Sequence, residues 1–306
     1  MKTDRRSLLK AGLGLGLFPA ANLLAVPDPY SRAGGRIMVG CAAYSFRNQF
    51  RYMKGKENSR FSSDKPEMTM TGFIEYCAKH GVAGAELTSY FFPPGVQVAD
   101  LAECRKVAHI NGVAVSGTAV GNNFSHPAGA PERAEQMEYV KEWIDHAAIL
   151  GAPHIRVFAG KHPKGVSEED AERNAIGALE EAGEYAASKG IFLGIENHDS
   201  ITTADRLLRI VRAVKNPFVG VNLDSGNFMA DDVYAEIEES APYAVNVQLK
   251  TEIKVGKTKE PADMDRVIGI LKDSGYAGYA VLEYEEEADP YEHVPPLLEK
   301  LQSLCS

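Results

Sequence analysis

The sequence predicts an α/β fold with a single parallel eight-stranded (β/α)8 barrel, because one structural unit recurs along the chain. From residue 36 onward, short apolar runs rich in β-formers alternate with longer amphipathic stretches. Consecutive runs begin 25 to 46 residues apart, and a βα unit needs about 30 residues or more. Glycine follows most of the amphipathic stretches, as expected for a residue that ends helices. Eight strand-like runs that alternate with helices are typical of a closed barrel.

The expected strands are eight apolar runs. They cover residues 37–46, 83–91, 113–120, 154–159, 191–197, 219–223, 244–249 and 279–284. An open, doubly wound sheet is the alternative arrangement, and it usually carries a glycine-rich phosphate-binding turn after its first strand. The segment from Gly40 to Ser45 contains no GxGxxG motif, so the sequence favours the barrel.

The expected helices lie between these strands and end at recognisable stop signals. They cover residues 70–80, 99–111, 131–150, 168–189, 204–214 and 262–274. Within the third, Met137, Val140 and Ile144 recur at helical spacing. All but one of the six are followed directly by glycine, and the helix over 204–214 stops before the dipeptide Asn216-Pro217.

Composition and charge are those of a globular protein and argue against nucleic acid as its partner. The 306 residues are 44% hydrophobic and 25% charged, which are ordinary values for a folded domain. The formal net charge is −9, whereas a protein that binds nucleic acid needs a basic face. The four cysteines have no spacing typical of a metal site.

Residues 1–25 have the features of an export signal. Arg5 and Arg6 precede an apolar run from Ala11 to Ala25, and paired arginines resemble a bacterial twin-arginine signal. The run is too short for a permanent membrane-spanning helix. We therefore expect a periplasmic protein exported by the twin-arginine route, without a stable membrane anchor; an ordinary amphipathic N-terminus is the alternative. Residues 26–35 are expected to be a flexible lead-in, and residues 36–304 to form the barrel.

Oxygen-bearing side chains end the last four expected strands: Glu196, Asp224, Gln248 and Glu283. In such a barrel the reactive side chains project from the carboxyl ends of the strands. Buried carboxylates that converge without a cation repel one another, and their burial is costly. A divalent metal would remove that cost, and oxygen donors favour Mg²⁺ or Mn²⁺ over Zn²⁺ or Co²⁺. The alternative is that each carboxylate forms a salt bridge with a neighbour.

The order of these residues resembles the xylose isomerase-like TIM barrel superfamily of sugar phosphate isomerases and epimerases, over about residues 36–304. The resemblance is carried by four segments: residues 83–88 with Glu86, residues 151–158, residues 195–198 and residues 223–227. Two positions depart from the family pattern. Gln248 stands where the family usually has a histidine ligand, and Asn227 stands where many ketose epimerases have histidine.

The resemblance implies a metal-dependent reaction on a sugar. The metal, most simply one Mn²⁺ or Mg²⁺, would grip a carbonyl and a neighbouring hydroxyl and stabilise an enediolate. Glu196 and Glu283 would remove and return the proton while also holding the metal. Asp224 would be a ligand only, and Gln248 a weak one.

Further substrate-binding residues are expected at the same rim. Lys250 points the same way as Gln248 because it lies two residues further along the strand. The full set of expected substrate-binding residues is Arg156, His198, Lys250, Glu86, Tyr44 and Asn227. The acidic run at residues 285–287 is expected to be a solvated loop.

Three functions are compatible with the sequence. The first is an exported sugar isomerase or epimerase, acting on free or glycosidic sugars. The second is a lyase or dehydratase that uses the same site on a keto-sugar or 3-keto glycoside, where the enolate expels a leaving group. The third is a carbohydrate-binding barrel without catalysis. In each case the partner is a small-molecule sugar, with a homo-oligomer as an open possibility.

Overall fold

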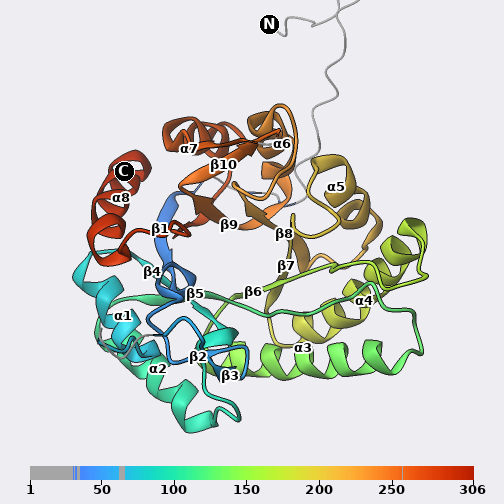
Figure 1. The fold of residues 1–306 in the computed structure, drawn as a ribbon, viewed down its shortest axis with the longest axis horizontal. Coiled ribbons are helices and arrows are strands. Elements are labelled where there is room, and N and C mark those ends of the chain that lie inside the picture. Colours follow the sequence, from blue (N-terminus) through green and yellow to red (C-terminus); the bar gives the residue numbers. More distant parts are fainter. Residues whose placement is uncertain (1–29, 31, 33–34, 62–65, 257) are drawn as a thin grey trace, which may run out of the picture.

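The computed structural model describes residues 30, 32, 35–61, 66–256 and 258–306, and its centre is a closed parallel barrel. Figure 1 shows the ring of strands with helices around it. In barrel order, each strand hydrogen-bonds to the next and the last to the first. The strands are β1 (Ile37–Ala42), β12 (Gly278–Glu283), β9 (Ala244–Lys250), β8 (Val219–Asp224), β7 (Phe192–Glu196), β6 (His154–Val157), β5 (Ala114–Ala119) and β4 (Gly84–Thr88). The predicted fold is confirmed.

Eight α-helices of the described residues surround the barrel (Figure 1). Most begin at a side chain that accepts a backbone N–H bond, such as Thr69, Ser167 or Asp232. The helix before Gly151 ends with that glycine in the left-handed conformation, at φ 77°. They are α1 (Met70–Lys79), α2 (Val98–Ile110), α3 (Pro131–Leu150), α4 (Glu168–Ser188), α5 (Ala204–Ala213), α6 (Val233–Ser240), α7 (Met264–Asp273) and α8 (Pro290–Cys305).

Two of these helices were not among those predicted from the sequence. α6 has eight residues, about two turns, so its apolar period is too short to stand out. α8 contains Pro295 and Pro296 inside its span, and proline normally argues against a helix. The other six expected helices agree with the structure to within two residues at each end.

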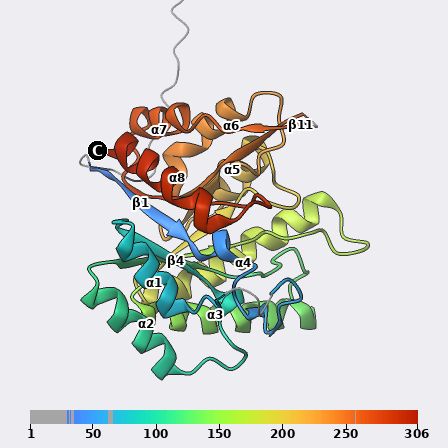
Figure 2. The same ribbon diagram turned by 60° about the vertical axis from the view of Figure 1, so that its left-hand side comes forward.

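The first two predicted strands are shorter in the structure because the chain turns into 3₁₀-helices at their carboxyl ends. These turns, Ala43–Phe46 and Ser89–Phe91, carry Tyr44 and Tyr90 at the barrel mouth. Two small hairpins were also not predicted: β2 (Tyr52–Met53) with β3 (Lys56–Glu57), and β10 (Glu252–Val255) with β11 (Thr258–Pro261). Figure 2 shows the β10–β11 hairpin extending past the barrel beside α6.

The opposite end of the barrel receives part of the segment that precedes β1. The hydroxyl of Tyr30 donates to the carbonyl of Val219 at 3.0 Å, and Arg32 donates to the carbonyl of Ala244 at 2.7 Å. Both carbonyls belong to the first residue of a strand. The predicted export signal at residues 1–25 lies outside the described residues. Among the residues described, no helix is long and apolar enough to cross a membrane.

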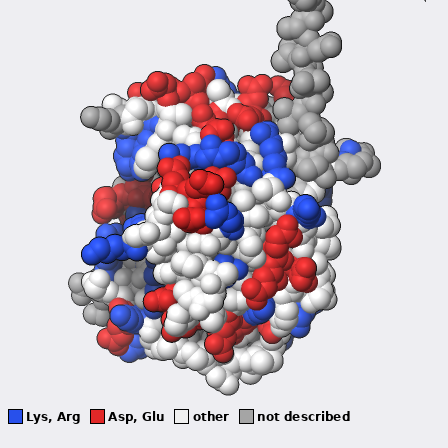
Figure 3. All heavy atoms as spheres, turned by 90° about the vertical axis from the view of Figure 1, so that its right-hand side faces the viewer, with Lys and Arg blue, Asp and Glu red and all other residues white. Residues whose placement is uncertain are grey.

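The surface carries charges of both signs. On the face that Figure 3 shows, acidic and basic side chains are interspersed rather than gathered into one basic surface.

Candidate active site at the carboxyl ends of the strands

A polar cleft of about 180 Å³ opens at the carboxyl ends of the barrel strands. This is the end of a (β/α)8 barrel where enzymes place their reactive groups. Glu196, Asp224, Lys250 and Glu283 are the last residues of β7, β8, β9 and β12. The cleft is lined by Tyr44, Lys54, Thr88, Tyr90, Arg156, Phe158, Glu196, His198, Asn227, Gln248, Lys250, Glu283 and Glu285.

One side of the cleft is organised around Glu196. Arg156 Nε lies 2.9 Å from Glu196 Oε2, and Asn227 donates its amide N–H to Glu196 Oε1 at 2.9 Å. The guanidinium also donates to the carbonyl of Val120 at 2.8 Å and lies 4.0 Å from the centre of the Phe158 ring. Burial raises the pKa of Glu196 to about 7, although the charge of Arg156 opposes the rise. The carboxyl is thus held in one orientation with its proton affinity raised.

The other side of the cleft is organised around the ammonium group of Lys250. Its Nζ lies 2.9 Å from Glu283 Oε1, 3.4 Å from Asp224 Oδ2 and 2.9 Å from Glu285 Oε2. Burial lowers the pKa of Lys250, but the three carboxylates outweigh burial and hold that pKa well above its ordinary value. Burial raises the pKa of Asp224 to about 8, with Lys250 opposing the rise. Lys250 is therefore a charged group in a buried cluster of acids.

Gln248 lies deeper than the sequence suggested. β9 extends to Lys250, which is level with Glu283, whereas Gln248 is level with Val281. Its carbonyl oxygen accepts an N–H from Asn222 at 2.7 Å, and its amide donates to Glu86 at 2.7 Å. Both bonds tie the side chain to the interior of the barrel, beneath the ammonium group.

Glu86, which was expected to contact substrate, belongs to the same buried network and does not line the cleft. Its second carboxyl oxygen accepts from Asn246 at 3.0 Å, and Asn246 also donates to Asn222 at 2.9 Å. Burial raises the pKa of Glu86 to about 8, with the charge of Glu283 adding to the rise. The network forms a closed floor beneath the cleft.

The metal that the family resemblance implies does not fit this arrangement. A hard divalent cation needs several oxygen ligands turned toward one point. Of the four expected donors, Gln248 turns its oxygen to Asn222, and Glu196 turns Oε2 to Arg156. The ammonium group of Lys250 contacts the remaining two carboxylates. Across the described part of the chain, no group of three or more His, Cys, Asp or Glu side chains is arranged to hold a metal.

The remaining expected residues lie at the rim. Tyr44 lines the cleft and follows β1, which is paired with the strand that ends at Glu283. Burial raises the pKa of the Tyr44 hydroxyl, with Glu285 and Glu283 adding to the rise. His198 Nδ1 lies 3.3 Å from Asp199 Oδ2, and its ring centre is 4.6 Å from that of Phe158. Both rim side chains are near enough to contact a bound ligand.

Two charged cleft residues, Glu285 and Lys54, were not expected from the sequence. Glu285 was assigned to a solvated acidic loop, but its carboxylate reaches Lys250. Lys54 lies in the turn between β2 and β3, with Nζ 4.5 Å from the centre of the Tyr90 ring. No sequence signal marks either residue, because each reaches the cleft through a loop whose path depends on the fold.

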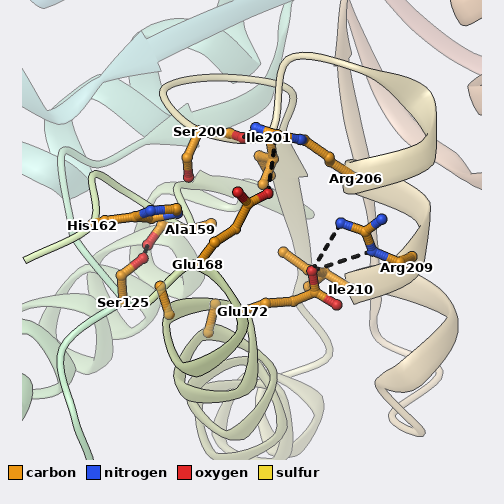
Figure 4. Close-up of a pocket in the computed structure, with 12 residues that line it drawn as sticks. Ser125, Ala159, His162, Glu168, Glu172, Ser200, Ile201, Arg206, Arg209 and Ile210 are labelled. Atoms are coloured by element: carbon orange, nitrogen blue, oxygen red, sulfur yellow. Dashed lines mark hydrogen bonds and ion pairs between the residues drawn. The ribbon is translucent and has the colours of Figure 1, made fainter. Parts of the chain in front are cut away.

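A second cavity, shown in Figure 4, lies beside α4 and α5 rather than at the barrel mouth. Glu168 faces Arg206 at 2.9 Å, and Glu172 faces Arg209 at 3.2 Å. Its volume of about 10 Å³ is enough for one water at most. We interpret it as a structural cluster of ion pairs between two helices.

Comparison with known proteins agrees with this description of the fold. A 3-keto-D-glucoside 4-epimerase from E. coli superposes with a TM-score of 0.67 at 14% identity, covering 88% of this chain and 100% of that one. A D-psicose 3-epimerase from Clostridium cellulolyticum H10 superposes with a TM-score of 0.66 at 17% identity, covering 88% and 96%. At these identities the superpositions show the fold alone.

A relative in Xenopus laevis, named "Putative hydroxypyruvate isomerase", is 24% identical over 179 residues, 53% of this chain and 65% of that protein. This chain thus spans 65% of the length of the curated relative that it matches. The family described as "Xylose isomerase-like TIM barrel" matches residues 74–302. By that match, together with the closed eight-stranded barrel, the chain belongs to the xylose isomerase-like TIM barrel family.

Proposed function

We propose that this chain is an isomerase or epimerase of a sugar or keto-sugar, which moves a proton on the carbon next to a carbonyl. The observation that carries the proposal is the pair of carboxyl groups of Glu196 and Glu283. They project from β7 and β12, which are separated in the barrel by β8 and β9. The two groups therefore face a bound substrate from different sides of the cleft, as a two-sided proton transfer needs.

In the proposed reaction, one carboxylate takes the proton from the carbon beside the carbonyl. The electron pair of the broken C–H bond forms a C=C bond, and the carbonyl oxygen becomes an oxyanion. The other group, which begins as a carboxylic acid, returns its proton to the opposite face of the same carbon in an epimerase. In an isomerase it protonates the former carbonyl carbon, while the neighbouring hydroxyl passes its proton to the oxyanion and becomes the new carbonyl. Positive groups at the cleft stabilise the oxyanion, and Arg156 also holds Glu196 in place. No step passes through a metal, because the expected donors are engaged elsewhere.

The similarity to keto-sugar epimerases and to a hydroxypyruvate isomerase relative supports this reaction class. In each case the name describes an enzyme that rearranges a molecule with a carbonyl beside a hydroxyl-bearing carbon. A carbohydrate-binding barrel without catalysis would not need two opposed carboxyl groups in the cleft.

A lyase acting on a 3-keto glycoside is the second candidate, favoured by a side cavity that adjoins the cleft. This cavity of about 170 Å³ shares Asn227, Lys250 and Glu285 with the cleft. Its other walls are residues of the β10–β11 hairpin, with Gly226, Thr251 and Glu286. A group linked to the sugar would extend into it. In the lyase, the enolate expels that group instead of recovering a proton.

We also propose that the chain acts in the periplasm after twin-arginine export. The paired Arg5 and Arg6 support this location. Cell fractionation of the wild type and of the variant with both arginines changed to lysine tests it. Export of wild type and retention of the variant in the cytoplasm is the expected result; equal distributions would contradict it.

The reaction is tested with the full chain on ketoses, aldoses and 3-keto glycosides, with products separated by chromatography. We expect a new isomer or epimer with wild type, and losses of about 100-fold or more with Glu196→Gln and Glu283→Gln. Glu103→Gln is the matched control, because Glu103 forms an exposed ion pair with Lys106 on α2. Release of the linked group would favour the lyase. Binding without turnover of any sugar would refute both enzymes.

A further inference from the structure

Lys250 occupies a position that is unusual for a lysine side chain. The residue is 6% exposed, and its ammonium group contacts carboxylates from β8, from β12 and from the loop after β12. A buried charge is tolerated only when it is paired. Here one ammonium group is paired with three carboxylates, and all three contact the same atom, Lys250 Nζ.

The ammonium group contacts Asp224 and Glu283, two of the four residues expected to hold the metal. A small divalent cation binds carboxylate oxygens at about 2.0–2.2 Å. An ion bound jointly by Glu283 Oε1 and Asp224 Oδ2 would share both oxygens with Lys250 Nζ, which lies 2.9 and 3.4 Å from them. The two cations also repel each other, so the ion and the ammonium group exclude one another.

The backbone and a neighbouring glycine hold the lysine side chain in this direction. The backbone N–H of Lys250 donates to Ser225 Oγ at 2.9 Å. A Cβ atom on Gly226 would lie 2.6 Å from both Lys250 Cγ and the carbonyl oxygen of Glu252, so glycine at this position leaves room for the lysine stem. The contacts between the end of β9 and the residues that follow β8 therefore fix the position of the ammonium group.

The side-chain amide of Gln248 is hydrogen-bonded to buried residues and is not available to bind an ion beside the ammonium group. Turning its carbonyl oxygen toward the carboxylates would break its bonds to Asn222 and Glu86. Both partners are fully buried, and leaving a buried polar group unpaired costs about 1–3 kcal/mol. Gln248 stands where the family usually has a histidine ligand, and its side chain is instead part of the buried network beneath the cleft.

We propose that the ammonium group of Lys250 is the resident cation of this cleft and takes the place of a divalent metal. In the reaction, which rests on the proposed function, one ammonium N–H turns from Glu285 to the substrate oxygen. Glu285 is suited to release it because its side chain is 43% exposed, against 8% for Glu283. The ammonium group then stabilises the oxyanion while Glu283 remains beside it.

The test measures metal content and thermal unfolding of the full chain. Elemental analysis follows loading with Mn²⁺, Mg²⁺, Co²⁺ or Zn²⁺ and removal of free ions, and the melting temperature is compared with and without each ion and EDTA. We expect wild type to retain far less than one ion per chain and to melt at the same temperature throughout. Lys250→Met should gain about one ion per chain and melt higher with it, because three acids have lost their cation.

Two further variants keep the result interpretable. Lys106→Met removes an exposed lysine from a single ion pair and should behave as wild type. Lys250→Arg keeps the charge and should remain free of metal, which covers the case in which Lys250→Met fails to fold. Wild type that holds one ion per chain, released by EDTA, would overturn the proposal.

The outcome is separate from that of the proposed function, because neither readout requires a substrate. Wild type that binds a metal and isomerises a sugar would refute the role of Lys250 and leave the proposed function standing. Wild type that stays free of metal but converts no sugar would refute the proposed function and leave Lys250 standing as the resident cation.

Discussion

Arg156→Met tests whether the Glu196 side of the cleft is held by a buried ion pair. The guanidinium pairs with Glu196 and donates to the carbonyl of Val120, and its side chain is 7% exposed. Methionine keeps much of the stem volume but removes the charge, so both partners lose their positive neighbour. Breaking a buried pair by removing one partner costs about 3–5 kcal/mol. With a urea slope of about 3 kcal/mol/M, the unfolding midpoint should fall by about 1 M or more.

Equilibrium urea unfolding, followed by circular dichroism, measures this change. Arg173→Met is the control, because Arg173 pairs with Glu169 and Asp170 on the exposed face of α4 and should lose about 1 kcal/mol or less. The double variant Arg156→Met/Glu196→Gln should recover part of the loss, since no unpaired carboxylate remains. Equal losses for Arg156→Met and Arg173→Met would show that the ion pair of Arg156 with Glu196 does not stabilise the fold.

Three further predictions concern other parts of the barrel. Gly226→Ala should lower kcat by about tenfold or more, because its new Cβ would lie 2.6 Å from both Lys250 Cγ and the carbonyl oxygen of Glu252 and would displace the lysine; unchanged kinetics would contradict this. Asn227→Ala removes the hydrogen bond to Glu196 and should cost about tenfold in kcat; an unaltered kcat would count against it. Burial holds the pKa of His154 at about 3, so the fold keeps it neutral while the unfolded chain is protonated below about 6.5. Stability should therefore fall with pH below about 6.5, by about 2.7 kcal/mol at pH 4.5 from this residue.

Two controls accompany these measurements. Gly177→Ala adds a Cβ that meets nothing within 4 Å and should leave kcat unchanged. His154→Leu should flatten the fall in stability between pH 6.5 and 4.5, measured by urea unfolding at each pH. An identical pH profile in this variant would show that another group causes the fall.

The fold could be predicted from the sequence because its signals are local and repeated. Each barrel strand is a short apolar run, and glycine after a helix, as at Gly151, is decided by backbone conformation alone. α8 could not be predicted, because Pro295 and Pro296 argue against a helix that packing against the barrel nevertheless stabilises. The hairpins are short and depend on neighbours distant in sequence.

The sequence predicted which residues lie at the candidate site but not which of them form ion pairs and hydrogen bonds with one another. Strand ends located Glu196, Asp224 and Glu283, since the barrel places the carboxyl ends of its strands together. The expected strand ended at residue 249, one residue before the end of β9, and this difference changes which side chains pair. With β9 ending at Lys250, the lysine takes the level of Glu283, and Gln248 turns into the floor. Partner choice within a buried polar network depends on such register, which sequence patterns do not specify.

Proton transfer through an enediolate is the central claim, and deuterium incorporation tests it most directly. The full chain is incubated in D₂O with the sugar that it converts, and the product is analysed by mass spectrometry and proton NMR. We expect one deuterium at the carbon that receives the proton, with incorporation lost in Glu196→Gln and Glu283→Gln. Product formed without deuterium would contradict the account, because the hydrogen would then have moved as a hydride and not through a carboxyl group.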